Sequence, residues 1–136
     1  MNLTIEKIPD DRRLAIVGVQ GDVDGSNYKE LVAKARELYD QGIEKMLLDL
    51  SETSFMSSSG LVAIHRIALL FQGEKLSEPE NGWSAIHALE NAPDRGRQQR
   101  VKLVNPQDRV KRTLVVSGLD QFFEIHSELG AALSSF

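Results

Sequence analysis

The chain contains no cysteine among its 136 residues. Disulfide bridges, thiolate catalysis and cysteine-based zinc sites are therefore excluded. Long apolar runs are also missing, because no stretch approaches the roughly 20 residues of a membrane-spanning helix. The N-terminal segment MNLTIEKIPDDRR has neither the apolar core of a signal peptide nor the acid-free basic character of a transit peptide. We therefore expect a cytoplasmic protein with no membrane partner.

The chain also lacks an excess of basic residues. Sixteen Lys and Arg stand against twenty Asp and Glu, which gives a formal net charge of −4. A nucleic-acid-binding protein normally carries a basic face, so this balance argues against nucleic acid as a partner. Hydrophobic residues make up 41% and charged residues 26%, as in ordinary globular proteins. The length fits one domain over residues 1–136 with a core of useful size.

Strand and helix patterns alternate along the chain. Period-two and β-branched apolar stretches predict strands, and apolar residues at helical spacing predict helices. The predicted strands cover residues 3–8, 14–20, 45–50, 100–105 and 122–126. The first predicted helix begins at Ser26 or Asn27 and has Gly42 as its C-cap. The other predicted helices cover residues 60–71, 106–119 and 127–136. This order predicts an α/β fold with parallel neighbouring strands and crossover helices.

Residues 72–100 differ in composition from the rest of the chain. They contain two of the four prolines, three glycines and many charged residues. We interpret this stretch as a surface insertion with a short helix over WSAIHALE, because structureless loops this long are uncommon inside compact domains. Trp83, the single tryptophan, lies in that helix. It belongs either to a small satellite core or to a partner contact, and both interpretations stay open.

Two polar loops follow predicted strands: GDVDGSN over 21–27 and DLSETSFMSSSG over 49–60. In α/β sheets, ligands and modifications gather beyond the carboxyl ends of strands. The simplest interpretation of both loops is turn formation and helix capping. One serine is enough for a cap, yet Ser57, Ser58 and Ser59 stand in a row. A hydroxyl at a helix N-terminus lies beside free N–H groups, which favours a phosphate there.

Catalytic sites have little support in the sequence. The three histidines are His65, His87 and His126, and none of them is well placed as a base for Ser58. The serine run does not match a nucleophile elbow, and no glycine-rich phosphate loop or zinc-protease pattern occurs.

Two further groups of charged residues have simple explanations. Asp22, Asp24 and Asp49 could gather a magnesium ion as in a receiver domain. However, the acidic pair after the first strand would have to be Asp10 and Asp11, which lead into a second strand, and no lysine ends the last strand. We therefore expect Asp49 to accept hydrogen bonds from its own loop. A late basic group is interpreted as a solvated helix face and loop. It comprises Arg95, Arg97, Arg100, Lys102, Arg109, Lys111 and Arg112.

Three spaced motifs resemble those of STAS domains, the family of anti-sigma factor antagonists. LLDLSETSFMSSSGLVAI over 47–64 resembles the family signature of an apolar strand, a short loop and a Ser-Gly-Leu helix start. GDVDGSN resembles the loop after the second strand. NPQDRVKRTLVVSGLDQFFEI over 105–125 resembles the closing helix. The match covers residues 14–71 and 101–125 in the family's order.

The resemblance implies an α/β STAS fold, a central mixed β-sheet with helices packed mainly on one face. It also implies an anti-sigma factor antagonist that is not an enzyme, needs no cofactor and acts by partner switching. Ser58 matches the serine phosphorylated by the partner, a serine kinase that is itself the anti-sigma factor; a phosphatase is a further candidate partner. Asp24 matches the acidic residue near that serine. The implied partner surface comprises Asp24, Ser57, Ser58, Ser59 and Gly60.

Two departures from the family pattern are visible. Ser57 stands where many members carry Asp, and residues 72–100 exceed what a compact crossover needs. Family members also act as non-phosphorylated scaffolds in signalling complexes, which is the alternative function. In that case the serine run only caps a helix and the insertion recognises the partner. We expect the insertion to leave Ser58 uncovered.

Overall fold

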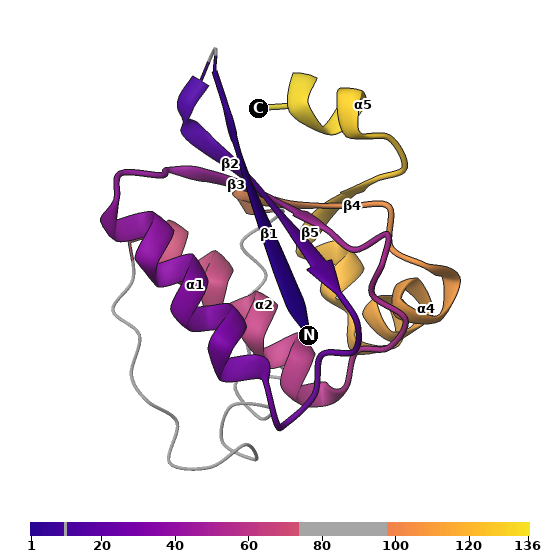
Figure 1. The fold of residues 1–136 in the computed structure, drawn as a ribbon. Helices are drawn as coiled ribbons and strands as arrows, with labels where there is room; N and C mark the ends of the chain where they lie inside the picture. Colours follow the sequence, from indigo (N-terminus) through magenta and orange to yellow (C-terminus); the bar gives the residue numbers. More distant parts are fainter. Residues whose placement is uncertain (10, 74–97) are drawn as a thin grey trace.

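A five-stranded sheet forms the centre of the computed structural model, which describes residues 1–9, 11–73 and 98–136 (Figure 1). The strands are β1 (Asn2–Ile8), β2 (Asp11–Gln20), β3 (Lys45–Asp49), β4 (Gln98–Val104) and β5 (Phe123–His126), and they lie in this order across the sheet. β1 pairs antiparallel with β2, whereas the other neighbours pair in parallel. The sheet is therefore mixed, which confirms the predicted fold class.

The helices are distributed unequally over the two faces of the sheet (Figure 1). α1 (Tyr28–Asp40), α2 (Ser58–Phe71) and α4 (Asp108–Ser117) contribute to the larger core, and α5 (Leu129–Ser134) to a smaller one. The 3-10 helix η1 (Leu119–Gln121) follows α4. The predicted alternation of elements is confirmed for the described residues, with bounds that shift by up to three residues. For example, α2 begins at Ser58 and not at Gly60.

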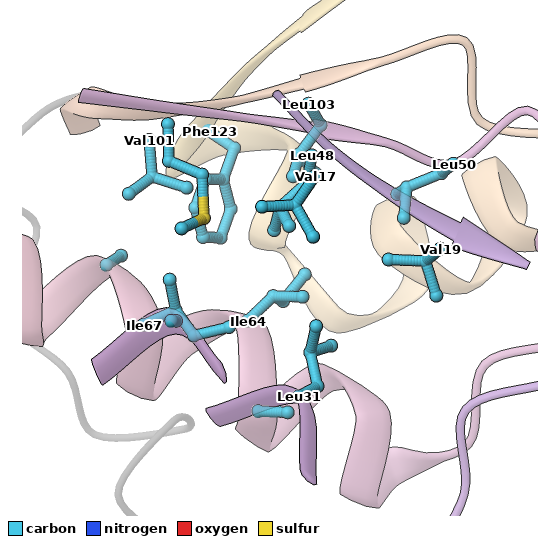
Figure 2. Packing of buried hydrophobic residues seen from close by; sticks show 14 of the residues in the cluster. Val17, Val19, Leu31, Leu48, Leu50, Ile64, Ile67, Val101, Leu103 and Phe123 are labelled. Carbon is cyan, nitrogen blue, oxygen red and sulfur yellow. The ribbon is translucent and has the colours of Figure 1, made fainter. Parts of the chain in front are cut away.

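The larger core lies between the sheet and α2 (Figure 2). Val17, Leu48 and Leu103 come from three neighbouring strands, and Ile64 and Ile67 of α2 pack in the same cluster; each is at most 1% exposed. α2 also packs against α1, so most of its side chains are buried. This explains its nearly continuous apolar sequence, and the residue of α2 that is exposed, Ser58, lies at its N-terminal end.

Lys102 belongs to the smaller core and not to a solvated basic group as predicted. Alternation along β4 turns its side chain to the face that α5 covers, and it is 1% exposed. Its ammonium donates to the backbone oxygen of Ser135 at 2.8 Å and to its Oγ at 2.9 Å. Lys102 Nζ also lies 3.1 Å from Glu124 Oε2 and 4.7 Å from the centre of the Phe136 ring. Burial of this charge is therefore balanced by several partners, which attach the C-terminal segment to the sheet.

The predicted insertion falls largely outside the described residues. α2 ends at Phe71 and β4 begins at Gln98, two residues before the predicted strand. Residues 74–97 lie outside the described part of the chain. The predictions for the short helix and for Trp83, His87, Arg95 and Arg97 therefore also lie outside the described residues.

The Lys102–Glu124 pair gives the folded chain a pH-dependent stability. Burial raises the pKa of the Glu124 carboxyl, but the hydrogen bond and positive charge of Lys102, with smaller contributions from His126, outweigh it, so the pKa lies below its usual value of 4.5. The pair therefore contributes fully above pH 4.5 and less as the pH falls through the folded-state pKa. We expect Glu124→Gln to lose about 2 kcal/mol of unfolding free energy near pH 7, and less below pH 4.5.

Urea unfolding followed by circular dichroism at a series of pH values measures this difference. Glu128→Gln changes an exposed carboxylate just before α5 and serves as the control, with a small difference at every pH. A difference for Glu124→Gln that does not change with pH would contradict the role assigned to the pair.

Candidate functional site

The two polar loops lie against each other beyond the carboxyl ends of β2 and β3. Val23 and Met56 form an isolated parallel bridge. The backbone N–H of Val23 donates to the oxygen of Phe55 at 3.0 Å, and the N–H of Ser57 donates to the oxygen of Val23 at 2.9 Å. This bridge is parallel like the pairing of β2 with β3, although its register differs from theirs by two residues, so residues 21–27 and 51–57 share one surface.

Side chains reinforce the contact between these loops. The Thr53 hydroxyl is buried and donates to the backbone oxygen of Val19 at 2.8 Å. The Ser54 hydroxyl donates to Asp22 Oδ1 at 3.0 Å. Two residues of the second loop are thereby used to hold the first loop in place.

Gly60 is the residue that lets α2 approach this pair of loops. A Cβ atom at Gly60 would lie 2.4 Å from Met56 Cγ and 3.2 Å from both the Val23 oxygen and Cγ1. These are the two residues of the bridge, so a side chain here would push the loops and the helix apart. The predicted partner-surface residue Gly60 is buried and acts through packing.

The three consecutive serines have different environments. Ser57 is the N-cap of α2, and its side chain accepts a hydrogen bond from the Gly60 N–H at 3.4 Å. Ser58 is the first helical residue and is exposed, and its hydroxyl has no hydrogen-bond partner among the described residues. Ser59 is half-buried, with Oγ 3.6 Å from where a Cβ on Gly25 would lie. Of the three serines, only Ser58 is therefore exposed.

Asp24 is held in the first loop by its neighbours. Its Oδ1 accepts hydrogen bonds from the Ser26 N–H at 2.9 Å and from the Ser26 hydroxyl at 2.5 Å. The Ser26 side-chain bond first, and its backbone bond second, hold the pKa of Asp24 below its usual value. Asp24 is therefore ionised at neutral pH, close to the exposed carboxylate of Asp22.

Asn27 supports the same loop instead of capping α1. It occupies the N-cap position, as predicted for Ser26 or Asn27, but its side chain makes no cap hydrogen bond. Its Oδ1 accepts from the Asp24 N–H at 3.0 Å, and its Nδ2 donates to the Asp22 oxygen at 3.0 Å. The side chain therefore fixes the turn that carries Asp24.

A third element adjoins this surface, and the local sequence patterns did not indicate it. The guanidinium carbon of Arg109 lies 4.9 Å from the centre of the Phe55 ring. Gln107 Nε2 donates to the backbone oxygen of Ser51 at 2.9 Å. Both contacts join the start of α4 to the loop before Ser58 across more than fifty residues of sequence, so no motif spacing could have revealed them.

The arrangement gives no support to hydrolysis or metal binding. His65 is 9% exposed, and its ring centre lies 5.3 Å from that of Phe122. His65 follows Ser58 by seven positions in the helix, which corresponds to about 10 Å along the axis. Among the described residues, no group of three His, Asp or Glu side chains could hold a metal ion. Asp49 accepts from the Ser51 N–H at 3.0 Å, as predicted.

The comparisons with known proteins identify the family. The family model of the STAS domain matches residues 2–75, which is more than half of the chain. The chain therefore belongs to the STAS domain family, which confirms the predicted relationship. In the part of the chain that the structure covers, no helix is long and apolar enough to cross a membrane.

Solved structures share the fold over nearly the whole chain. A candidate anti-sigma factor antagonist of Thermotoga maritima has a TM-score of 0.71 at 17% identity, over 97% of this chain and 92% of that one. An anti-sigma factor antagonist of Mycobacterium paratuberculosis has a TM-score of 0.69 at 19% identity, over 98% and 92%. The antagonist SpoIIAA in its unphosphorylated form has a TM-score of 0.63 at 18% identity, over 98% and 94%. At such identities the likeness establishes the fold.

The contact at Gly60 predicts a selective effect of alanine. Gly60→Ala is expected to lower the free energy of unfolding by about 1–3 kcal/mol, because Met56 and Val23 must move apart. Gly130→Ala in α5 is the matched control, since a Cβ there meets nothing within 4 Å and alanine favours helix. Thermal and urea unfolding of the two variants measure the difference. Equal stabilities would show that α2 does not depend on this close approach.

Proposed function

We propose that this chain is an anti-sigma factor antagonist that works by partner switching. The unphosphorylated surface around Ser58 binds an anti-sigma factor that is also a serine kinase, and this binding releases a sigma factor for transcription in the cytoplasm. Phosphorylation of Ser58 ends the complex. The observation that carries this proposal is the division of roles among the serines: Ser57 caps α2, and the hydroxyl of Ser58 is exposed.

The position of Ser58 suits a reversible phosphate. A phosphate there lies beside the free N–H groups of the first turn of α2 and the positive end of its dipole. It adds about −1.5 to −2 charges at neutral pH. The facing loop already carries Asp22 and the ionised Asp24. The modification therefore sharply increases the negative charge and the bulk of one small surface without disturbing the core beneath it.

The named relatives are consistent with such a switch. SpoIIAA has been solved in its unphosphorylated form and, as a Bacillus cell fate determinant, in its phosphorylated form, with TM-scores of 0.63 and 0.57 to this chain. We transfer to this chain the role of an antagonist that alternates between the two states. In this proposal the protein is a binding module and not an enzyme, and a phosphatase resets it.

The remaining predicted site residues have distinct parts in this proposal. Asp24 supplies fixed negative charge, and Ser59 packs beside Gly25. Ser57 and Gly60 set the start of α2 and its closeness to the loops. Substitutions at Ser57 and Gly60 therefore act on stability first, whereas substitutions at Ser58 act on the partner.

Substitution of Ser58 separates the two states. We expect Ser58→Asp to weaken binding of the anti-sigma factor several-hundredfold, which corresponds to about 3–4 kcal/mol, and Ser58→Ala to retain it. Ser134→Asp places the same charge on an exposed serine of α5 and should leave binding unchanged. Calorimetric titration with each purified anti-sigma factor kinase of the same cell measures the affinities.

Phosphopeptide mapping after incubation with ATP and the bound kinase completes the experiment. Phosphate on Ser58 supports the switch. Stable binding with no phosphate on residues 57–59, and equal affinity of the two Ser58 variants, would replace the switch with the scaffold function. No binding of the wild-type chain to any of these kinases would overturn the proposed function itself.

A further inference from the structure

The outward face of α4 carries exposed apolar side chains that the fold does not use. Val110 and Leu114 turn toward the core and are fully buried. Val115 and Val116 point away from it and are 52% and 82% exposed. Across the described residues only Ile5 and Leu129 are comparable, and each is 37% exposed. α4 therefore presents the most exposed apolar pair in the described part of the molecule.

Two valines at exposed helix positions lower the stability of the helix. β-branched side chains lose rotamer freedom in a helix, and their helix propensity is below that of alanine, leucine or lysine. Exposed in this way, neither side chain offsets the loss by burial. Single exposed apolar residues are ordinary on protein surfaces. An adjacent pair on one helix contributes favourable free energy only when another surface covers it and removes it from water.

Basic residues precede this apolar pair on α4. Val115 and Val116 follow Arg112 at positions i+3 and i+4, so Arg112 lies one helical turn before both valines. Lys111 and Arg112 are exposed, and within the described residues neither forms a salt bridge. The charged residues of α4 are Arg109, Lys111 and Arg112 against the single acid Asp108. A positive helix face is therefore set in a chain whose net charge is −4.

This face continues into the site at Ser58. Arg109 stacks on Phe55 at 4.9 Å, and Phe55 lies three residues before Ser58. The loops on the far side of this contact carry Asp22, Asp24 and Glu52. Along one continuous surface the charge therefore changes from negative at the loops to positive at α4, with Phe55 and Arg109 between them.

We propose that the outward face of α4 is a second contact surface for the anti-sigma factor. This proposal rests on the function proposed above. It takes an acidic segment of that partner, which carries at least one apolar side chain to cover Val115 and Val116. The charge change along the surface then fixes the orientation of the partner, because the reversed orientation would set like charges against each other at both ends. The partner contacts Ser58 at one end and α4 at the other.

A protein partner fits this face better than a lipid surface. Two valines present little apolar area, and no aromatic or leucine side chain accompanies them on α4 beyond the buried Leu114. An anionic membrane would also repel the adjacent acidic loops. An acidic protein segment can meet α4 alone, while other parts of the partner meet the loops.

Two substitutions on α4 test the affinity. Val116→Ser removes apolar contact and is expected to weaken binding of the anti-sigma factor about tenfold. Arg112→Glu is expected to weaken binding at least as much at low salt. Its effect should shrink as the salt concentration is raised, because the contact of Arg112 is electrostatic and that of Val116 is not. Leu129→Ser on α5 and Arg36→Glu on α1 are the matched controls, since both residues are exposed and lie elsewhere. All four side chains are exposed, so circular dichroism should report unchanged folding.

The absence of cysteine makes the occupant itself identifiable. Val116→Cys creates a single labelling site in a cysteine-free chain, and a photoreactive group attached there should cross-link to the anti-sigma factor. Mass spectrometry of the product should place the link within an acidic segment of the partner. The same label on Leu129→Cys should give no link.

The outcomes separate this inference from the proposed function. Binding of the wild-type chain with unchanged affinity of the Val116 and Arg112 variants would overturn the role of α4 and leave the function at Ser58 intact. A cross-link to a second copy of this chain, or binding to anionic vesicles that Val116→Ser abolishes, would assign the face to another occupant. Failure of the wild-type chain to bind any anti-sigma factor would overturn both.

Discussion

The close approach of Gly60 to Val23 and Met56 is the contact on which the site depends. It lets the first turn of α2 lie directly on the bridge between the two loops. The N–H of Ser57 can then donate to the Val23 oxygen while its hydroxyl serves as the helix cap. With backbone and side chain of Ser57 both engaged, the next residue is turned outward at a fixed place. The accessibility of Ser58 is therefore a consequence of packing two residues away.

The sequence predicts most of the fold because its signals are local. The apolar spacing of α2, the glycine after α1 and the β-branched strands each depend on neighbours within a few residues. Gly42 at φ 101° and Gly118 at φ 82° follow their helices as expected. The Ser58 motif was visible for the same reason, since cap, serine and glycine are consecutive.

The features that escaped prediction depend on residues far apart in the chain. Lys102 looks like any surface lysine until β4 is placed beneath α5, where Ser135 and Glu124 become its partners. The stacking of Arg109 on Phe55 joins elements whose separation no motif records. In both cases the sequence gives the residue type, and only the three-dimensional arrangement gives the neighbour. Basic residues that form one group in the sequence thus divide between a buried anchor and an exposed helix face.

The position of β4 in the sheet has a consequence for how the chain folds. β4 lies between β3 and β5, yet it follows α2 after the stretch from Phe71 to Gln98. The parallel pairing of β3 with β4 joins Met46 to Val101, which are 55 positions apart in the chain. Pairing at such separations slows folding, since distant strands must find each other before Leu103 and Phe123 complete the core. The pairings of β1 with β2 and of β2 with β3 join strands that are closer in the chain, and the segment that carries them also contains α1.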